Sequence, residues 1–392
     1  LAYTNRAVDE ICASIESIGD LAIDIRQQYL RIGSRHATQA RFREQLLQEQ
    51  IERISTRKDL KALIRERRIV VATVSSIASK TELLHLKHFD RVIIDEASQI
   101  LEPMLLGLLP SFKRCLLIGD HKQLPAVVVQ HPELSRVDDP DLRAIGLDNL
   151  RYSLFERLYL RCKAQGWDWA YAQLSQQGRM HRDIMDFPNL HFYEGDLQIL
   201  PTAFDREERQ TRSLHWPAAD LPPGLSAQLR AQRLLFFPTE ADGRSNTLKT
   251  NAHEAQTIVA IVEEFRALYR QQGRVLEAKS IGIITPYRAQ IAQIRQSLAE
   301  AAIDSSELTI DTVERYQGGA RDIIILSLCT NQLSQLSALV SESGEGVDRR
   351  LNVALTRAKE QLIVLGNPDI LLANGVYRAL MRAGGWRPDS EV

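Results

Sequence analysis

Six short runs of apolar, largely β-branched residues recur along the chain between longer segments of helical character. They cover residues 68–74, 91–95, 115–119, 280–285, 322–328 and 361–366. Runs of this length without polar alternation are typical of strands that are buried on both faces of a parallel sheet. Strands that alternate with helices predict an α/β fold, in which right-handed crossovers build a doubly wound parallel sheet with helices on both faces.

The spacing of these runs indicates how many domains the chain has. They form two groups, separated by a long stretch from about 120 to 280, which favours two α/β domains over one. We therefore place a first domain at residues 1–165 and a second at residues 166–392.

Two segments interrupt this pattern. Residues 20–67 are highly charged, and apolar residues recur in them at helical spacing, namely Phe42, Leu46, Ile51 and Ile54. This pattern predicts an inserted helical hairpin with a solvated charged face. Residues 201–232 are rich in charges and contain Pro217, Pro222, Pro223 and Gly224, which predicts an irregular surface excursion.

Composition limits the kinds of partner. Lys and Arg number 49 against 50 Asp and Glu, so a polyanion would have to be held by local basic clusters rather than by an overall positive field. Four cysteines without a C-x-x-C pair disfavour a zinc site and a disulfide framework. No apolar run reaches 18 residues and the first residues do not resemble a signal peptide. We therefore expect no membrane partner and an intracellular location, cytoplasmic or, in a eukaryote, nuclear.

Two adjacent carboxylates follow the apolar strand in VIIDEASQ, residues 92–99. Burial of two acids at a strand end is costly unless a metal or ligand is present. In phosphoryl-transfer enzymes the first acid of such a pair holds Mg²⁺ and the second orients or deprotonates the attacking water. Asp95 and Glu96 are candidates for these roles. The alternative is a strand that leads into a helix whose first turn favours acids.

A second polar cluster follows the strand in CLLIGDHKQLP. Gly119 and Asp120 end that strand, and Gln123 lies on the loop after it, where a sensor of the γ-phosphate would have to stand. A glutamine on a loop is usually only solvated. Two polar clusters at the ends of two buried parallel strands, however, are expected at one sheet edge, where such folds bind ligands.

A basic segment precedes the last strand. In RRLNVALTRAKEQLIVLG we expect Arg350, Arg357 and Lys359 on one helix, with the two arginines two turns apart on a shared face. An arginine delivered to the γ-phosphate from a second domain would stabilise the charge that develops during hydrolysis. The alternative is a basic helix face paired with surface acids. Three aromatic residues, Trp167, Trp169 and Tyr171, we interpret as core rather than as a base-stacking surface.

Taken together, these strings resemble a known series of motifs. In chain order they are LAYTNRAVDEI, VVATVSSIAS, VIIDEASQ, LIGDHKQLPAVV, QGRMHRDIMDFPNLHFYEGDL, IGIITPYRAQI, TVERYQGGARDIIILS and RRLNVALTRAK. The order resembles the motifs of superfamily 1 helicases, in the group that contains the nonsense-mediated-decay helicase, senataxin-like proteins and the Okazaki-fragment helicase-nuclease. The resemblance runs from residue 1 to about 367. It implies two RecA-like domains, with the helical insertion in the first, that bind ATP and Mg²⁺ between them and single-stranded DNA or RNA across both.

The resemblance also implies roles for individual residues. Asp95, as the Mg²⁺ ligand, and Glu96 match the Walker B pair, and Gln123 matches the γ-phosphate sensor. Arg179 and Arg357 match arginines that reach the nucleotide from the second domain. Further nucleotide contacts are expected from Gly119, Asp120, Arg350 and the coupling motif, which contains Gln317 and Gly318. Contacts with the sugar-phosphate backbone are expected from Thr4, Asn5, Ser75, Ser76, Thr285, Pro286, Tyr287 and Thr312.

The chain departs from the family pattern at its first motif. The phosphate-binding loop, G-x-x-x-x-G-K-[ST], is absent, and no Gly-Lys dipeptide occurs in the sequence. Because the acids, the glutamine and the arginines are in place, we expect residues ahead of Leu1 to supply the loop. We expect the 392 residues alone to bind ATP poorly and to hydrolyse little of it.

Two smaller departures affect single roles. Gly178 stands where the family usually has a tyrosine that could stack near a base. In the coupling motif, Gly319 and Ala320 replace a usual Arg-Glu pair, which removes a carboxylate.

Two functions remain open at this point. The first is an ATP-dependent helicase or translocase on single-stranded nucleic acid, with 5′ to 3′ movement implied by the subclass. The second is a clamp or scaffold that binds a strand without turnover and serves a fused or associated nuclease or effector domain. The series of motifs favours the first, and the missing loop is the best support for the second.

Overall fold

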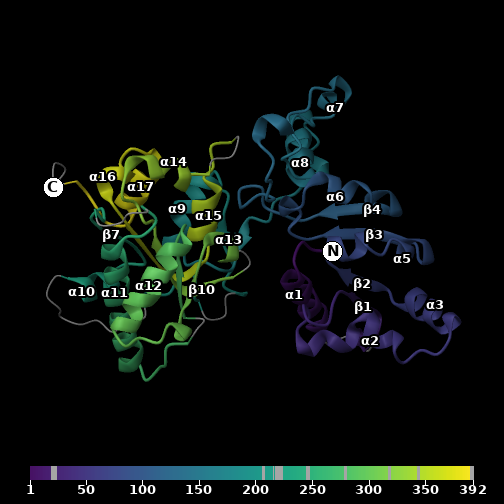
Figure 1. The fold of residues 1–392 in the computed structure, drawn as a ribbon, viewed down its shortest axis with the longest axis horizontal. Coiled ribbons are helices and arrows are strands. Elements are labelled where there is room, and N and C mark those ends of the chain that lie inside the picture. The colour runs from purple at the N-terminus through teal and green to yellow at the C-terminus, as the bar shows by residue number, and fades with distance from the viewer. Residues whose placement is uncertain are drawn as a thin grey trace. The chain divides into compact units, whose positions relative to one another are not determined.

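The computed structural model of the chain describes residues 1–18, 24–204, 208–214, 216, 224–243, 248–277, 280–316, 319–341 and 345–388. Within this part the chain forms two compact units, Leu1–Ala172 and Gln173–Val392 (Figure 1). No helix of the described part is long and apolar enough to cross a bilayer.

The second unit is built on a parallel sheet of five strands, in the order β7-β11-β10-β8-β9. The strands are β7 (Leu234–Pro238), β8 (Ile281–Ile284), β9 (Thr309–Asp311), β10 (Arg321–Ser327) and β11 (Ala358–Gly366). β10 lies at the centre, where it pairs in parallel with both β8 and β11. All its residues from Ile323 to Ser327 are buried, as expected for a strand covered on both faces.

Helices cover both faces of this sheet (Figure 1). On one face α11 and α12 pack against alternate strand residues such as Ile283, Ile325 and Ile363. α9 and α15 pack against β11, and α17 packs against β7. The helices of this unit are α9 (Arg182–Phe192), α10 (Leu225–Ala231), α11 (Ala252–Gln271), α12 (Arg288–Glu300), α13 (Val313–Tyr316), α14 (Leu336–Leu339), α15 (Arg349–Leu355), α16 (Pro368–Leu371) and α17 (Gly375–Ala383). A short separate pair joins β5 (Gln176–Gln177) to β6 (Gln198–Ile199).

The first unit contains two parallel strand pairs that the start of the chain connects. β1 (Tyr29–Ile32) pairs with β2 (Ile69–Ala72), and β3 (Phe89–Ile94) pairs with β4 (Phe112–Leu117). Ala2 donates to the Ala72 carbonyl at 3.1 Å and accepts from the Val74 amide at 3.0 Å. Leu1 accepts from the Asp95 amide at 2.8 Å. Leu1 and Ala2 therefore hydrogen-bond to both pairs, as a short strand between β2 and β3 would.

Apart from a small cluster of Leu30, Leu47 and Ile64, two apolar clusters form the core of the described part of the first unit. One contains Val92 and Ile94 of β3 together with residues of α4, α6 and α8. The other joins α1 to β1 and β2 through Cys12, Tyr29 and Val71. The helices of this unit are α1 (Asn5–Glu16), α2 (Leu47–Ile51), α3 (Arg57–Glu66), α4 (Val74–Ala78), α5 (Glu82–Leu86), α6 (Glu102–Leu106), α7 (Pro140–Ala144) and α8 (Leu154–Gln165).

All six apolar runs predicted to be strands form strands in parallel sheets, and the α/β fold class is confirmed. The prediction that all six are buried is wrong for β4, whose residues are exposed or half-buried. Strands β1, β5, β6, β7 and β9 were missed. The predicted helical hairpin at 20–67 is wrong, because β1 lies in it and its two α-helices are short. The charged Arg31 in the buried β1 concealed that strand, and residues 19–23 lie outside the described part.

Two other expectations also need correction. The stretch 201–232 is not only a surface excursion, because Gln210 and Trp216 are buried and α10 lies at its end. Trp167 and Trp169 are not core residues, since 40% and 86% of their surfaces are exposed.

A buried carboxyl group lies near the carboxyl ends of the strands of the second unit. Glu254 of α11 accepts from the Ser327 hydroxyl at 2.6 Å and from the Cys329 amide at 2.9 Å. Burial nevertheless raises the pKa of Glu254 from 4.5 to about 7, more than these hydrogen bonds lower it. Between these two pH values the folded state holds a proton that the unfolded state has released. The contribution of Glu254 to stability therefore falls as pH rises from about 4.5 to 7 and stays low above pH 7.

We predict that Glu254→Gln removes this pH dependence, because glutamine does not ionise. Between pH 5 and pH 8 the free energy of unfolding of the natural protein should fall relative to that of the variant. Urea titration at each pH measures both. Glu263→Gln, at an exposed position of the same helix, is the control and should follow the natural protein. A constant difference between Glu254→Gln and the natural protein across this range would contradict the prediction.

Candidate active site

Asp95 and Glu96 form a tight turn directly after β3. Glu96 has a positive φ of 52°, a left-handed conformation that residues other than glycine seldom adopt. The turn is stabilised because the Asp95 carboxylate accepts from the Glu96 amide at 3.0 Å. Gln99 donates its side-chain amide to the Glu96 carboxylate and so orients it. Both acids are half-buried, and Gln99 is a positioning contact that the sequence analysis missed.

The second predicted cluster follows β4 and lies against the first. A Cβ atom on Gly119 would lie 2.9 Å from the Ser98 amide nitrogen, so only glycine permits this close approach. Asp120 accepts from the Lys122 amide at 2.9 Å and from the Gln123 side chain at 2.8 Å. Gly119 and Asp120 therefore shape the loop, and Asp120 holds the side chain of Gln123.

The pairing of β3 with β4 brings these clusters to one edge. The two strands are parallel and in register from Val92 with Cys115 to Ile94 with Leu117, so their carboxyl ends coincide. Half-buried carboxylate oxygens with an amide oxygen nearby fit the ligand preference of Mg²⁺.

Two helix starts lie at the same edge, where Leu1 and Ala2 and then β2 end. Thr4 is exposed and caps α1 by accepting from the Ala7 amide at 3.2 Å. The side-chain oxygen of Asn5 is buried and has no hydrogen-bond partner among the described residues.

Ser75 and Ser76 lie in the first turn of α4 and differ in accessibility. Ser75 is exposed, whereas the Ser76 hydroxyl accepts from the hydroxyl of the cap residue Thr73 at 2.8 Å. Thr73 also accepts from the Ser76 amide. Of the two serines, Ser75 is therefore the more accessible to a ligand.

A buried ion pair fixes α1 against the sheet. Arg31 of β1 is fully buried and lies 2.7 Å from a carboxylate oxygen of Asp9 in α1. Asp9 also accepts from the Gln39 amide at 3.2 Å. The start of α1, with Thr4 and Asn5, is held in place by this pair.

The predicted strand contacts of the second unit follow β8 and β9, which are parallel neighbours. Thr285 is fully buried, and its hydroxyl has no hydrogen-bond partner among the described residues. The Thr285 hydroxyl does not face solvent, although a side-chain contact with the sugar-phosphate backbone of a nucleic acid would require it to. Pro286, Tyr287 and Thr312 are half-buried at the same edge.

Arg179 and Arg357 lie together at the opposite edge of this sheet. Arg357 directly precedes β11 and has only 2% of its surface exposed. Its guanidinium donates to the Val353 carbonyl at 3.1 Å. The guanidinium of Arg179 donates to the carbonyl of Thr356 at 3.2 Å, so the two arginines lie on adjacent backbone segments.

The expectation that Arg350, Arg357 and Lys359 share one helix is wrong. α15 ends at Leu355, Arg357 lies beyond its C-cap, and Lys359 belongs to β11. Arg350 lies at the start of α15, and 44% of its side chain is exposed. It forms an ion pair with Glu314. It lines a cavity of about 30 Å³ together with Thr285 and Pro286.

Gln317 and Gly318 of the coupling motif lie outside the described residues. Their neighbour Gly319 is described, and its carbonyl lies 3.5 Å from the Arg357 guanidinium. Gly178, the residue in place of the usual tyrosine, packs closely on Leu200, because a Cβ there would lie 2.5 Å from a Leu200 methyl.

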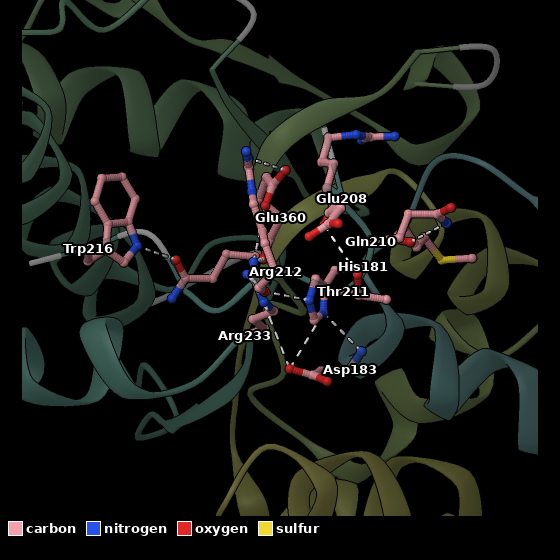
Figure 2. Close-up of polar contacts among 12 residues, drawn as sticks. His181, Asp183, Glu208, Gln210, Thr211, Arg212, Trp216, Arg233 and Glu360 are labelled. Carbon is pink, nitrogen blue, oxygen red and sulfur yellow. Dashed lines mark hydrogen bonds and ion pairs between the residues drawn. The ribbon is translucent and has the colours of Figure 1, made fainter. Parts of the chain in front are cut away.

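A polar cluster that the sequence analysis did not find lies beside the Arg179 segment (Figure 2). Arg233 and Glu360 are both buried and form an ion pair at 3.1 Å, which Arg212 extends. His181 contacts the Arg212 carbonyl at 3.0 Å. Burial, followed by the charge of Arg233, lowers the pKa of His181, so the imidazole is neutral near pH 7.

With this geometry described, comparison with known proteins decides the family. Residues 150–369 and 35–131 each match a family described as an AAA domain. The chain is 31% identical over 332 residues to "DNA polymerase alpha-associated DNA helicase A" of Saccharomyces cerevisiae, covering 80% of this chain and 44% of that protein. The chain belongs to the superfamily 1 helicases, in the group of the nonsense-mediated-decay, senataxin and Okazaki-processing type.

Other relatives agree. The chain is 31% identical to the mouse "DNA replication ATP-dependent helicase/nuclease DNA2", over 94% of this chain and 33% of that protein. It is 30% identical to "ATP-dependent helicase upf1" of Schizosaccharomyces pombe, over 96% of this chain and 40% of that protein. The chain thus spans less than half the length of these relatives. The solved arterivirus nonstructural protein 10 (helicase) aligns over 97% of this chain and 54% of that chain, with 11% identity and a TM-score of 0.41.

We predict that the first unit of the protein depends on Asp9 for its stability. Asp9→Ala leaves the Arg31 charge buried without a carboxylate, which should lower the free energy of unfolding of this unit by about 3–5 kcal/mol. Glu10→Ala removes an exposed pair with Arg6 from the same helix, and should cost less than about 1 kcal/mol. Urea unfolding of both variants checks this, and equal effects would contradict it.

Proposed function

We propose that this helicase is an ATP-driven translocase on single-stranded DNA or RNA that moves 5′ to 3′. The observation that carries the proposal is the shared sheet edge of Asp95, Glu96 and Gln123 in a chain of helicase family. Relatives named as ATP-dependent helicases support it. In this proposal ATP is hydrolysed between the two RecA-like units, and each cycle moves them along the strand.

The first unit would prepare the water for attack. Mg²⁺ held by Asp95 would neutralise charge on the phosphates. Glu96 would accept a proton from the attacking water, and its half-buried carboxylate is already oriented by Gln99. Gln123, held by Asp120, would contact the γ-phosphate as its sensor.

The second unit would supply positive charge to the transferred phosphoryl group. Arg179 and Arg357 are proposed to contact the γ-phosphate, as the family resemblance implies, and the coupling residues Gln317 and Gly318 to link nucleotide and strand. Arg179 and Arg357 lie on adjacent backbone segments, because the Arg179 guanidinium donates to the Thr356 carbonyl. This closeness supports a joint role, since two guanidinium groups would stabilise the charge spread over the phosphoryl oxygens.

The single-stranded nucleic acid would lie along the residues that follow the β-strands at their carboxyl ends. In the first unit we propose Thr4, Asn5, Ser75 and Ser76, and in the second Pro286, Tyr287 and Thr312, together with backbone groups around Thr285. Arg350 lies beside Thr285 and Pro286, so we assign it to the nucleic-acid phosphates rather than to the nucleotide. Hydroxyl, amide and guanidinium contacts to phosphate carry no base information.

The sequence contains no phosphate-binding loop, and we propose that hydrolysis requires one from outside these 392 residues. The same absence is compatible with a clamp that binds a strand without turnover, and that serves a fused or associated nuclease. The experiments below distinguish a motor from a clamp.

We predict that Glu96→Gln lowers strand-stimulated ATP hydrolysis at least about 100-fold, because the water loses its proton acceptor. The measurement uses a form of the protein that includes these 392 residues and a phosphate-binding loop. Binding of a labelled single strand should be unchanged. Glu52→Gln, at an exposed position of the first unit, is the matched control.

Two other outcomes of this experiment would contradict the proposal. Unchanged turnover in Glu96→Gln would refute the role of Glu96. Strand binding without any strand-stimulated turnover in the unaltered protein would identify a clamp.

We predict that strand binding weakens with salt and depends little on base sequence. The logarithm of the dissociation constant should rise with the logarithm of salt concentration by about 0.7 for each phosphate contacted. Ser75→Glu, which places a negative charge at an exposed proposed contact, should weaken binding, whereas Ser55→Glu at an exposed loop should not. Fluorescence anisotropy with oligonucleotides of different sequence measures both effects. Salt-independent binding would contradict the proposed contacts.

A further inference from the structure

Residues 208–214 contact the segment that carries Arg179, although at least 26 residues separate the two in sequence. We call residues 177–182 the Arg179 loop, and residues 209–212 the brace. Gln210 of the brace is only 1% exposed, which is unusual for a polar side chain in a stretch rich in charges. A buried amide side chain must be hydrogen-bonded, and its partners show what it holds.

The side chain of Gln210 has partners for both of its polar atoms. Its amide nitrogen donates to the Gln177 carbonyl at 2.8 Å and to the Met180 carbonyl at 2.9 Å. Its oxygen accepts from the Leu200 amide at 3.0 Å. The backbone carbonyl of Gln210 accepts from the Arg182 amide at 3.0 Å. One residue thus fixes both ends of the Arg179 loop.

The peptide groups next to Arg179 are also held. The side-chain oxygen of Gln177 accepts from the amides of Arg179, at 2.9 Å, and of Met180, at 2.8 Å. The guanidinium of Arg209 donates to the carbonyls of Gly178 and Arg179. The position of the Arg179 backbone is therefore determined from inside the loop and from the brace.

The far end of the brace is anchored to β11 (Figure 2). The Arg212 carbonyl accepts from Arg233 at 2.9 Å and from the neutral His181 ring at 3.0 Å. The Arg212 guanidinium pairs with Glu360 of β11 at 2.9 Å. Because Arg357 directly precedes β11, the brace ties the Arg179 loop to the same strand that follows the other arginine.

We propose that the brace sets the position of Arg179 relative to Arg357 and that Gln210 is its positioning residue. The inference rests on the proposed function in one respect, namely that Arg179 contacts the γ-phosphate. The Arg179 guanidinium already donates to the Thr356 carbonyl, next to Arg357. A displaced loop would move this guanidinium away from that place, and catalysis depends strongly on such placement.

The first test uses Gln210→Glu, which keeps the size of the side chain but removes both donors and sets a carboxylate against two carbonyls. Hydrogen exchange of the amides of Arg179, Met180 and Arg182 should become at least about tenfold faster. Gln256→Glu makes the same change at an exposed position of α11, and should leave this exchange unchanged. If Gln210→Glu fails to fold, Arg209→Ala, which removes the contacts to the Gly178 and Arg179 carbonyls, should give the same local effect. Unchanged exchange at these amides in a folded variant would overturn the proposal that the brace holds the Arg179 loop.

The second test separates positioning from a merely structural role. Strand-stimulated hydrolysis is measured for Gln210→Glu, Arg179→Ala and the double variant, in a form of the protein that hydrolyses ATP. We expect each single variant to lower kcat with little change in KM for ATP, and the double variant to be no slower than Arg179→Ala. Additive losses would overturn the positioning role of Gln210. Faster loop exchange combined with full activity of Arg179→Ala would instead overturn the proposed role of Arg179 and leave the brace intact.

Discussion

The parallel pairing of β3 with β4 is the constraint on which the candidate chemistry of the first unit depends. Parallel strands in register end at the same edge, so a turn after β3 and a loop after β4 must lie side by side. The close approach of Gly119 to Ser98 and the left-handed turn at Glu96 then fix how the two segments meet. The acids are half-buried because the sheet ends beneath them, which makes a cation a suitable partner.

In the second unit the proposed functional residues lie at both ends of the parallel strands. Its proposed strand contacts follow β8 and β9 at the carboxyl edge, whereas Arg179 and Arg357 lie at the amino end of β11. α15 connects the two edges, with Arg350 at its start and Arg357 just beyond its end.

The sequence was sufficient for those features that depend on neighbouring residues. The strands β2, β3, β4, β8, β10 and β11 each contain a short apolar run, and polar residues that follow β3 and β4 lie at the sheet edge as predicted. β1 escaped detection because a buried arginine interrupts it, and that arginine is tolerated only through a partner 22 residues away, Asp9. No local pattern signals such a pair.

Roles that depend on distant contacts could not be predicted. The helical spacing of Arg350 and Arg357 suggested a shared face, but only the structure shows that the helix ends at Leu355. Thr285 follows its strand as expected, yet its hydroxyl points into the interior. Gln210 lies in a charged stretch without a motif, and its function is visible only from the carbonyls of Gln177 and Met180 that it holds.

The central claim is that residues of both units act in one hydrolysis reaction. The most direct measurement is strand-stimulated ATP turnover by Arg357→Ala, in a form of the protein that includes a phosphate-binding loop. If the guanidinium stabilises the transferred phosphoryl group, turnover should fall about a thousandfold or more, while the affinities for ATP and for the strand remain close to those of the unaltered protein. Turnover at the unaltered rate in a folded Arg357→Ala protein would contradict the account.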